Sequence, residues 1–570
     1  MMGGGEATVG GGLVLEALRA NRIRHIFGCS GSEWVCLLER LAESREPFPA
    51  YINCRHETVA VAMAMGYART TGRVAAVLLH DSVGPLHAAM AIRAAYRAGD
   101  PILICTGDAF GQKDYEVDPV TGWTWMARLG DRGGVQSLVQ GYVKWSGRAE
   151  SHRDVQEAVT QGCQMACRPP AGPSLVAIPW QILVSAQDAP RIPFSVPPET
   201  PSGPDLELLN RAAAVLVESK NPAIVTEYGA RGSESVANLV RLSELLAIPV
   251  LETVDPAQSN FPPDHPLYMG DRASEVLEGA DAVLLIGVNT PWYPPDAYPG
   301  KNAKVILIDE DPDKSRVPHW AYRTDVRLGG EMGTTLCALT DAVEAMLVGS
   351  EETGARTRAR FQKWKQTHEK GEAEWSDEGR REEGGSGLTP SGFFRRLRSL
   401  LPENGLILDE TVSQSSLIRR NLGRPGHYIR AGAGGLGIGL GVAAGVKLAR
   451  REDPVILFIG DGTFVFNPVL AALGGCSEHD LPILIVLFNN GGYGAIRNAY
   501  RKYSPHGWSV RNHTYLGADF EPGPDYVKVA EALGGLGERL TEPAAIEPCF
   551  RRGLEELARG RWFLIEVAFR

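Results

Sequence analysis

The sequence predicts an α/β protein made of three consecutive open parallel-sheet domains. The chain has 570 residues, well beyond the roughly 250–300 at which a single hydrophobic core stops growing. Short apolar runs alternate with helix-like stretches along most of its length, a pattern typical of parallel strands covered by helices. A proline-rich segment at 187–205 interrupts the alternation. The chain length, the alternating strand-like and helix-like runs and the proline-rich break together predict several domains, each of the α/β class.

The first domain is expected over residues 1–186. Its apolar runs are the expected strands, and the stretches between them are the expected helices. In chain order these are strand 25–28, helix 33–42, strand 74–79, helix 86–98 and strand 101–106. The segment 187–205 then contains six prolines, which exclude a long helix and suit an extended connector.

The second and third domains are expected over residues 205–350 and 388–570. Each contains four short apolar runs that read as buried strands. They lie at 222–225, 248–251, 282–287 and 304–308 in the second domain, and at 406–408, 455–459, 483–488 and 562–567 in the third. Between the two domains, residues 351–387 are highly charged, so we expect this segment to be partly helix and partly exposed linker.

Charge and cysteine content exclude several classes of protein. The formal net charge of -10 offers no surplus of cations for nucleic-acid phosphates, which favours a small-molecule partner. The nine cysteines are scattered and odd in number, unlike a disulfide framework, so we expect a reducing cytoplasm. Neither a signal peptide nor an apolar run of about 18 residues is found, so neither export nor a membrane span is expected.

Polar residues follow two strands of the third domain. The run 455–459 ends at Gly460-Asp461-Gly462-Thr463, and the run 483–488 ends at Asn489-Asn490. Asp461 and Asn490 are 29 residues apart, which leaves room for one crossover helix between neighbouring parallel strands. Both polar tips would then face one cleft, where open sheets bind ligands. Carboxylate and amide oxygens suit Mg²⁺, and glycine backbone N–H groups suit a diphosphate. We call residues 460–463 and 489–494 the metal-diphosphate cassette.

This cassette resembles that of the thiamine diphosphate-dependent family of 2-oxo acid decarboxylases and acetohydroxyacid synthases. The resemblance implies that Mg²⁺ is held by Asp461, Asn490 and the carbonyl of Gly492. It also implies that the third domain binds the diphosphate and the first domain the pyrimidine. Further cofactor contacts are implied for Ser413, Gly434, Leu436, Gly462, Thr463, Tyr493, Gly494, Ala495 and Ile496.

A glutamate in the first domain matches the acid that activates the cofactor in this family. Arg55-His56-Glu57-Thr58 leads into a helix of small residues that ends at Gly66-Tyr67-Ala68-Arg69. The resemblance implies that Glu57 binds the aminopyrimidine and promotes formation of the C2 carbanion. An ordinary solvated acid at a helix N-terminus is the alternative. Because Glu57 and the cassette lie in different domains, the family's arrangement implies a homodimer or a homotetramer.

Within the family, the chain looks most like benzoylformate decarboxylase. By that resemblance Ser32 would bind the substrate carboxylate and His80 would relay protons, although a buried structural histidine is the alternative. The second histidine of those enzymes should fall near 290–294, where none is present. Val412, Arg430 and Asn498 are expected along the substrate pocket. Arg430 and Asn498 would make this pocket more polar than one that binds a phenyl ring.

The chemistry expected from the resemblance is decarboxylation of a 2-oxo acid, with or without carboligation to a second carbonyl. The main alternative is an acetohydroxyacid synthase-like transferase or a 2-hydroxyacyl-CoA lyase, in which the central domain would bind FAD or an adenosine nucleotide. Residues 227–232 are the candidate for a phosphate contact there, although they lack a complete Gly-x-Gly-x-x-Gly pattern. A non-catalytic paralogue is the second alternative, but a scaffold would not need Glu57, Asp461 and Asn490 together.

Overall fold

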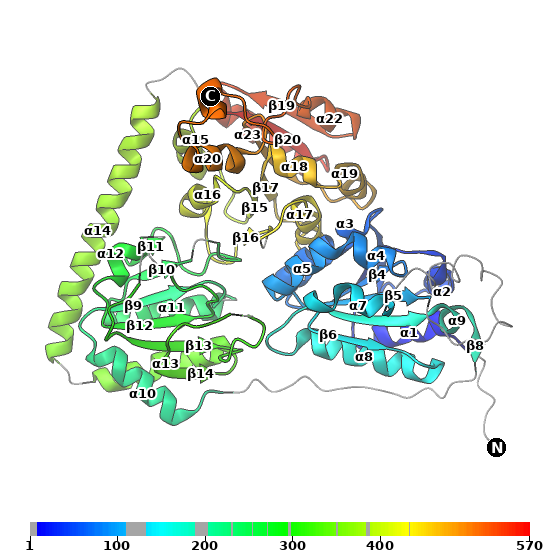
Figure 1. Ribbon diagram of the computed structural model, residues 1–570, viewed down its shortest axis with the longest axis horizontal. Coiled ribbons are helices and arrows are strands. Elements are labelled where there is room, and N and C mark those ends of the chain that lie inside the picture. Colours follow the sequence, from blue (N-terminus) through cyan, green and yellow to red (C-terminus); the bar gives the residue numbers. More distant parts are fainter. Residues whose placement is uncertain are drawn as a thin grey trace.

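Three six-stranded parallel sheets form the framework of the chain, as a computed structural model shows (Figure 1). The structure describes residues 8–109, 133–187, 203–229, 232–253, 255–270, 272–293, 298–317, 319–348, 351–383, 388–432 and 434–569. Each sheet is flanked by helices, which confirms the predicted α/β class with three open sheets in series. Most of the proline-rich segment, at 188–202, lies outside the described residues.

The first sheet has the strand order β3-β2-β4-β5-β7-β6. Its strands are β2 (His25–Cys29), β3 (Ala50–Asn53), β4 (Ala75–Leu79), β5 (Ile102–Asp108), β6 (Trp145–Arg148) and β7 (Ser174–Pro179). The main helices are α1 (Gly10–Ala20), α2 (Val35–Glu43), α3 (Glu57–Thr71), α4 (Val83–His87), α5 (Ala89–Ala98), α7 (Gly134–Val139), α8 (His152–Cys167) and α9 (Trp180–Val184). A short antiparallel pair, β1 (Thr8–Val9) and β8 (Ala186–Gln187), joins the two ends of this domain. The helix expected at 86–98 is divided at Ala88 into α4 and α5.

The central sheet has the order β11-β10-β9-β12-β13-β14. Its strands are β9 (Pro222–Thr226), β10 (Val250–Glu252), β11 (Tyr268–Gly270), β12 (Ala282–Ile286), β13 (Lys304–Asp309) and β14 (Val326–Gly329). They are accompanied by α10 (Leu206–Glu218), α11 (Ser233–Leu246), α12 (Ala273–Leu277) and α13 (Met332–Leu347). The charged segment is more helical than expected, because α14 (Glu351–Glu383) is one helix of 33 residues along the side of the molecule (Figure 1).

The third sheet has the order β16-β15-β17-β18-β20-β19. Its strands are β15 (Leu406–Glu410), β16 (Tyr428–Arg430), β17 (Val455–Gly460), β18 (Leu484–Asn489), β19 (Leu536–Leu540) and β20 (Phe563–Ala568). Its helices are α15 (Pro390–Arg398), α16 (Ser415–Leu422), α17 (Gly439–Ala449), α18 (Asp461–Phe466), α19 (Val469–Glu478), α20 (Gly494–Tyr503), α21 (Trp508–Asn512), α22 (Tyr526–Ala532) and α23 (Ile546–Ala558).

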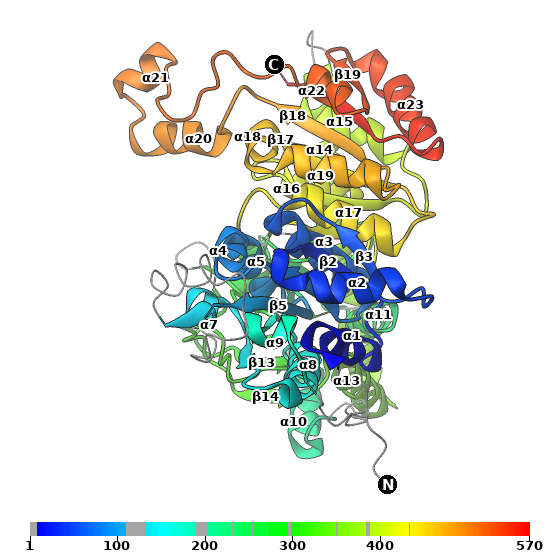
Figure 2. The same cartoon turned by 90° about the vertical axis from the view of Figure 1, so that its right-hand side faces the viewer.

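Helices α3 and α17 join the first domain to the third (Figure 2). Their backbones approach so closely that side chains do not fit at the crossing. A Cβ on Gly66 would lie 2.1 Å from the carbonyl oxygen of Val442, and one on Gly445 would lie 2.0 Å from that of Met63. The two helices and their neighbours share one hydrophobic core. This packing fixes helix α3, and therefore its first residue, Glu57, relative to the third domain.

In the part of the chain that the structure describes, no helix combines the length and the apolar character needed to cross a membrane.

Candidate active site

The first half of the cassette lies at the end of strand β17. The strand ends at Gly460, and Asp461 begins helix α18. The Asp461 carboxylate is buried, and it accepts hydrogen bonds from the backbone N–H groups of Gly462 at 2.8 Å and Gly492 at 2.7 Å. Burial raises the pKa of Asp461, and these backbone donors partly offset that rise. The two halves of the cassette are thus joined directly through Asp461.

The second half of the cassette follows strand β18, which pairs in parallel with β17 as predicted. Its glycines are required by the local backbone. Gly492 has a φ of +141°, and a Cβ there would lie 1.9 Å from the carbonyl oxygen of Ala518. Tyr493 N–H donates to that carbonyl at 2.8 Å. Asn490 is exposed, and its side-chain amide has no hydrogen-bond partner among the described residues.

Arg497 holds this turn from the first part of helix α20, a role that the sequence did not reveal. Its guanidinium donates to the carbonyl of Asn490 at 2.5 Å and to that of Gly491 at 2.7 Å, and it pairs with Asp519 at 2.6 Å. A cation seven residues after the turn is a weak signal, because many helices carry an exposed arginine in their first turns. Here it fixes the direction of two backbone carbonyls beside the predicted metal ligands.

A third strand end, that of β15, supports the loop that carries Leu436. Glu410 is buried and accepts hydrogen bonds from the N–H groups of Gly437 and Ile438 and from the amide of Asn467. Burial raises the pKa of Glu410 to about 7. Gly434, with a φ of +79°, starts the loop, and its carbonyl accepts a hydrogen bond from Arg93 of the first domain at 3.2 Å.

The other predicted cofactor residues surround this edge of the third sheet. Ser413 lies next to the start of helix α20, because its Oγ would be 3.7 Å from a Cβ on Gly494. Gly462 packs against the ring of Tyr493, where a Cβ would lie 2.6 Å from Cδ1. Thr463 is buried, Leu436 is half-buried, and Ala495 and Ile496 are exposed, as is the predicted pocket residue Val412.

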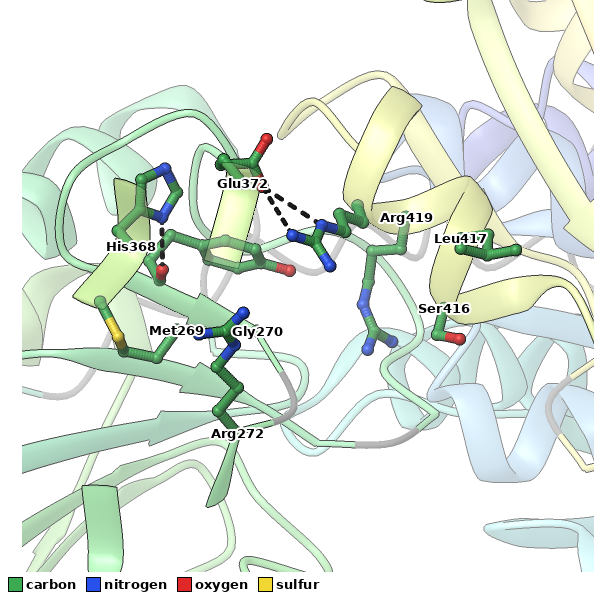
Figure 3. A pocket seen from close by; sticks show the side chains of 10 residues that line it. Met269, Gly270, Arg272, His368, Glu372, Ser416, Leu417 and Arg419 are labelled. Atoms are coloured by element: carbon green, nitrogen blue, oxygen red, sulfur yellow. Dashed lines mark hydrogen bonds and ion pairs between the residues drawn. The ribbon is translucent and has the colours of Figure 1, made fainter. Parts of the chain in front are cut away.

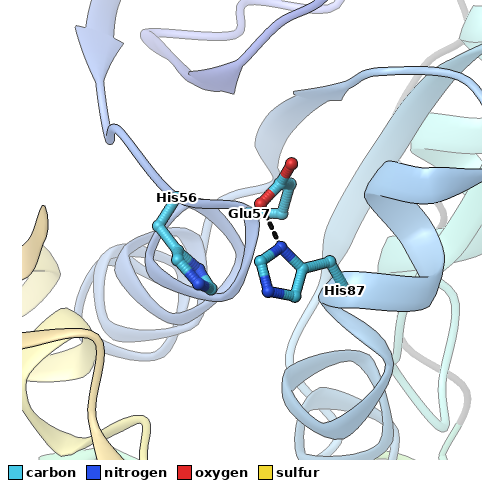
Figure 4. A group of neighbouring side chains, drawn as sticks. All are labelled: His56, Glu57 and His87. Atoms are coloured by element: carbon cyan, nitrogen blue, oxygen red, sulfur yellow. Dashed lines mark hydrogen bonds and ion pairs between the residues drawn. The ribbon is translucent and has the colours of Figure 1, made fainter.

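Glu57 begins helix α3 and has a histidine partner (Figure 4). Its Oε2 lies 2.7 Å from Nδ1 of His87, the last residue of helix α4. The Glu57 side chain is 17% exposed and remains open to a ligand. Burial, followed by the neighbouring Glu57 carboxylate, raises the pKa of Cys29 to about 11, so this residue stays a thiol. Among the described residues, no hydrogen bond or ion pair joins Glu57 to the cassette.

His80 follows strand β4 and forms a pair with Glu33. Nδ1 of His80 is 2.9 Å from Oε2 of Glu33, whose carboxylate is completely buried and also accepts the N–H of Asp81. The hydrogen bond to Glu33 raises the pKa of His80 above its ordinary value, although burial opposes it. Ser32, the neighbour of Glu33, is exposed. The sequence identified Ser32 and His80 as candidates but did not reveal Glu33.

Glu57 and His80 lie at one edge of the first sheet because of its strand order. Strands β3, β2 and β4 are neighbours and run in parallel, so their carboxyl ends meet at this edge. Glu57 follows β3, Glu33 follows β2 and His80 follows β4. Glu33 and His80 are in hydrogen-bond contact, and Glu57 lies at the same edge of the sheet.

Two residues predicted to line the substrate pocket already have polar partners. Arg430 pairs with Asp255 at 2.7 Å and with Asp409 at 3.2 Å, so two carboxylates match its charge. Asn498 accepts a hydrogen bond from Arg501 at 3.1 Å on the exposed side of helix α20. Their contact with a substrate stays a prediction.

Two cavities adjoin the central domain. The larger has a volume of about 590 Å³ and lies at the carboxyl ends of β9, β12 and β13, where Glu227, Asn289 and Asp309 line it. Lys314 in this cavity is bound to Asp309 and to Tyr228. The smaller cavity, of about 120 Å³, contains Arg272 and the ion pair of Arg420 with Glu372 (Figure 3). Part of the candidate phosphate loop, at 230–231, lies outside the described residues.

Comparison with known protein families matches all three domains. Residues 8–123 match the thiamine pyrophosphate enzyme N-terminal TPP binding domain, residues 209–339 match the central domain, and residues 412–567 match the C-terminal TPP binding domain. The chain belongs to the thiamine pyrophosphate enzyme family.

Individual members of the thiamine pyrophosphate enzyme family are similar over nearly the whole chain. Benzoylformate decarboxylase of Pseudomonas aeruginosa is 28% identical over 85% of this chain and 86% of its own. An acetolactate synthase large subunit of Mycobacterium tuberculosis is 27% identical over 95% of this chain and 93% of its own. The fold is shared with a Rhodococcus jostii 4-hydroxybenzoylformate decarboxylase, with a TM-score of 0.76, 24% identity and 99% coverage of both chains.

The third domain has the features that thiamine diphosphate and Mg²⁺ require. Asp461 is a buried carboxylate at a strand end, Asn490 offers an unengaged amide, and a Cβ on Gly462 would lie 3.6 Å from the carbonyl oxygen of Gly492. These three groups would give an all-oxygen ligand set, which suits Mg²⁺. The glycine-rich turn after strand β18 also offers backbone N–H groups, which suit a diphosphate.

Proposed function

We propose that the chain is a thiamine diphosphate-dependent lyase that decarboxylates a 2-oxo acid. The observation that carries this proposal is the placement of Glu57 and the Glu33–His80 pair at the same edge of one sheet. A decarboxylase needs an acid that activates the cofactor and a nearby group that exchanges protons with the substrate adduct. Glu57 is suited to the first role and His80 to the second.

The cofactor would supply the electron sink for cleavage of the carbon–carbon bond. Asp461, Asn490 and Gly492 would hold Mg²⁺, and the cassette backbone would hold the diphosphate. On the substrate side, Ser32 is exposed beside the Glu33–His80 pair, where its hydroxyl can donate to a carboxylate. His80 would then hold or release a proton near that carboxylate, with Glu33 keeping its ring in place.

The complete site would form between two copies of the chain. Large apolar side chains are exposed near both halves of the site, namely Val83 and Leu86 beside Glu57, and Val412, Phe466 and Leu470 near the cassette. Exposed apolar groups of this kind are typical of an interface. We therefore propose a homodimer in which the first domain of one subunit covers the cassette of the other, with a homotetramer as a further assembly.

Carboligation is the second candidate activity. Sequence similarity to an acetolactate synthase extends over 95% of the chain, compared with 85% for the benzoylformate decarboxylase of Pseudomonas aeruginosa. Decarboxylation and carboligation share the same early steps, so the residues at the site serve both. A central-domain flavin would accompany the synthase-like alternative, and the 590 Å³ cavity has room for part of a ligand. An absorption spectrum of the purified protein tests for this flavin.

One experiment separates these activities. The purified protein, loaded with thiamine diphosphate and Mg²⁺, is given a panel of aromatic and aliphatic 2-oxo acids, with and without an acceptor aldehyde, and the products are identified. Release of CO₂ with an aldehyde product supports the decarboxylase. A hydroxyketone formed only with the acceptor supports the carboligase. If no 2-oxo acid loses CO₂ under either condition, the proposed lyase function is wrong.

A further inference from the structure

His87 and Glu57 are held together by more than one contact. Nδ1 of His87 lies 2.7 Å from Oε2 of Glu57, and Oγ of Thr58 donates to the backbone carbonyl of His87 at 2.9 Å. These bonds tie the last turn of helix α4 to the first turn of helix α3 (Figure 4). The imidazole thus reaches the carboxylate from a second helix whose end is itself fixed.

The hydrogen-bond pattern assigns the protons of the two histidines. When the Glu57 carboxylate is ionised it can only accept, and Nδ1 of His87 is then the donor in this contact. Nδ1 of His56 accepts the backbone N–H of Thr58 at 3.1 Å as the N-cap of helix α3, which puts the proton of the neutral His56 ring on Nε2. The two rings lie 4.2 Å apart between centroids, so His56 packs against His87 and restricts its rotation.

The same three side chains are close enough to be considered as metal ligands. The candidate ligand atoms of His56, Glu57 and His87 all lie within 4.8 Å of one another. However, two ligands at about 2.05 Å from a tetrahedral ion lie about 3.3 Å apart, whereas Nδ1 of His87 and Oε2 of Glu57 are 2.7 Å apart. The Nδ1 lone pair of His56 is already used by the N-cap. A hydrogen-bonded pair therefore explains the geometry better than a metal centre.

We propose that His87 is a positioning residue for Glu57. By holding Oε2, it would leave Oε1 to face the aminopyrimidine of the cofactor and would prevent the side chain from rotating away. His56, which packs on His87, completes the support. The inference rests on the proposed function, because it assigns to His87 a role only if Glu57 activates the cofactor.

The test uses two variants of the full-length protein. His87→Leu removes the donor, whereas His87→Asn places an amide N–H near the position of Nδ1. Without substrate, exchange of the C2 proton of bound thiamine diphosphate with deuterium is expected to slow roughly 10-fold in His87→Leu, the effect of losing one hydrogen bond. Exchange should recover in His87→Asn. Cofactor affinity should stay within about 3-fold in both, because the diphosphate and Mg²⁺ contacts remain.

A measurement on the cofactor-free protein makes the test independent of turnover. With ¹⁵N-labelled histidine, the signals of His87 are identified by their loss in His87→Asn. They should show a protonated Nδ1 and should shift in Glu57→Gln, which replaces the acceptor. A merely structural role for His87 would change folding in His87→Leu but would give no recovery in His87→Asn.

The results distinguish failure of this inference from failure of the proposed function. If Glu57→Gln slows C2 proton exchange and His87→Leu exchanges as fast as the unmodified protein, Glu57 keeps its role and the role of His87 is refuted. An absent recovery in correctly folded His87→Asn also refutes it. If Glu57→Gln itself exchanges at the normal rate, the proposed function fails, and the role of His87 fails with it.

Discussion

Nδ1 of His80 and Oε2 of Glu33 lie 2.9 Å apart, with the glutamate side chain completely buried and the histidine partly open. A buried carboxylate is costly unless it is paired. Glu33 meets this requirement with His80 on one side and the backbone N–H of Asp81 on the other. The exposed part of the Glu33–His80 pair is therefore the imidazole of His80, which has a fixed orientation and a raised pKa.

Glu33→Gln should change the pH dependence of the reaction. The hydrogen bond to Glu33 raises the pKa of His80, so the stabilisation from the charged pair is complete below the ordinary histidine pKa and is lost as pH rises through the raised value. If protonated His80 acts as the acid, the alkaline limb of the kcat/KM profile should move to lower pH in Glu33→Gln. If the alkaline limb of the kcat/KM profile stays at the same pH in Glu33→Gln, the Glu33–His80 pair does not govern the pH dependence.

His80→Ala should lower kcat on the order of 100-fold, because it removes the group proposed to exchange protons with the substrate adduct.

The sequence alone was sufficient to predict the features that depend on short runs of neighbouring residues. Apolar runs between helix-like stretches predicted the three sheets, and the polar tips of β17 and β18 predicted the cassette, because the carboxyl ends of adjacent parallel strands meet. Glu33 was not recognised because its neighbours give it the pattern of an ordinary acid near a helix start. Its burial against His80, 47 residues away, depends on β2 and β4 being neighbours in the sheet.

The same reason explains why Arg497 and His87 were missed. Each is an exposed-looking polar residue on a helix, and each acts through a contact with another turn. Arg430 shows the converse. Its charge suggested a polar substrate pocket, but the fold places Asp255 and Asp409 beside it, and the latter lies on strand β15. Only the three-dimensional structure reveals whether a charged side chain such as that of Arg430 already has an oppositely charged partner.

Asp461→Ala should weaken the binding of Mg²⁺ and thiamine diphosphate without unfolding the third domain. The substitution removes the proposed carboxylate ligand and also the acceptor for the N–H groups of Gly462 and Gly492. We expect the affinity for Mg²⁺ to fall at least about 10-fold. Metal and cofactor contents after dialysis measure this loss. Asp480→Ala, at an exposed turn of the same domain, is the control and should retain both. Full retention in Asp461→Ala would contradict the metal role.

Gly445→Ala should destabilise the contact between the first and third domains. The added Cβ would lie 2.0 Å from the carbonyl oxygen of Met63, a backbone atom that cannot move without separating α3 from α17. Overpacking of this kind costs roughly 1–3 kcal/mol or more. Thermal unfolding should therefore begin at a lower temperature. Gly279→Ala is the matched control, because a Cβ there meets nothing within 4 Å. Equal melting curves for the two variants would show that the helix crossing tolerates the methyl group.

A mixing experiment tests whether the site is shared between subunits. Glu57→Gln and Asp461→Ala should each be inactive alone, since each damages both sites of a homodimer. In a mixed dimer, one site contains both altered residues and the other contains Glu57 from one chain and Asp461 from its partner. Random assembly of the two variants in equal amounts makes half of the dimers mixed, so about a quarter of all sites should be intact. Activity near a quarter of that of the unmodified protein is therefore expected after co-expression. If each site were built from one chain, every site in the mixture would carry one damaged residue, and co-expression would restore no activity.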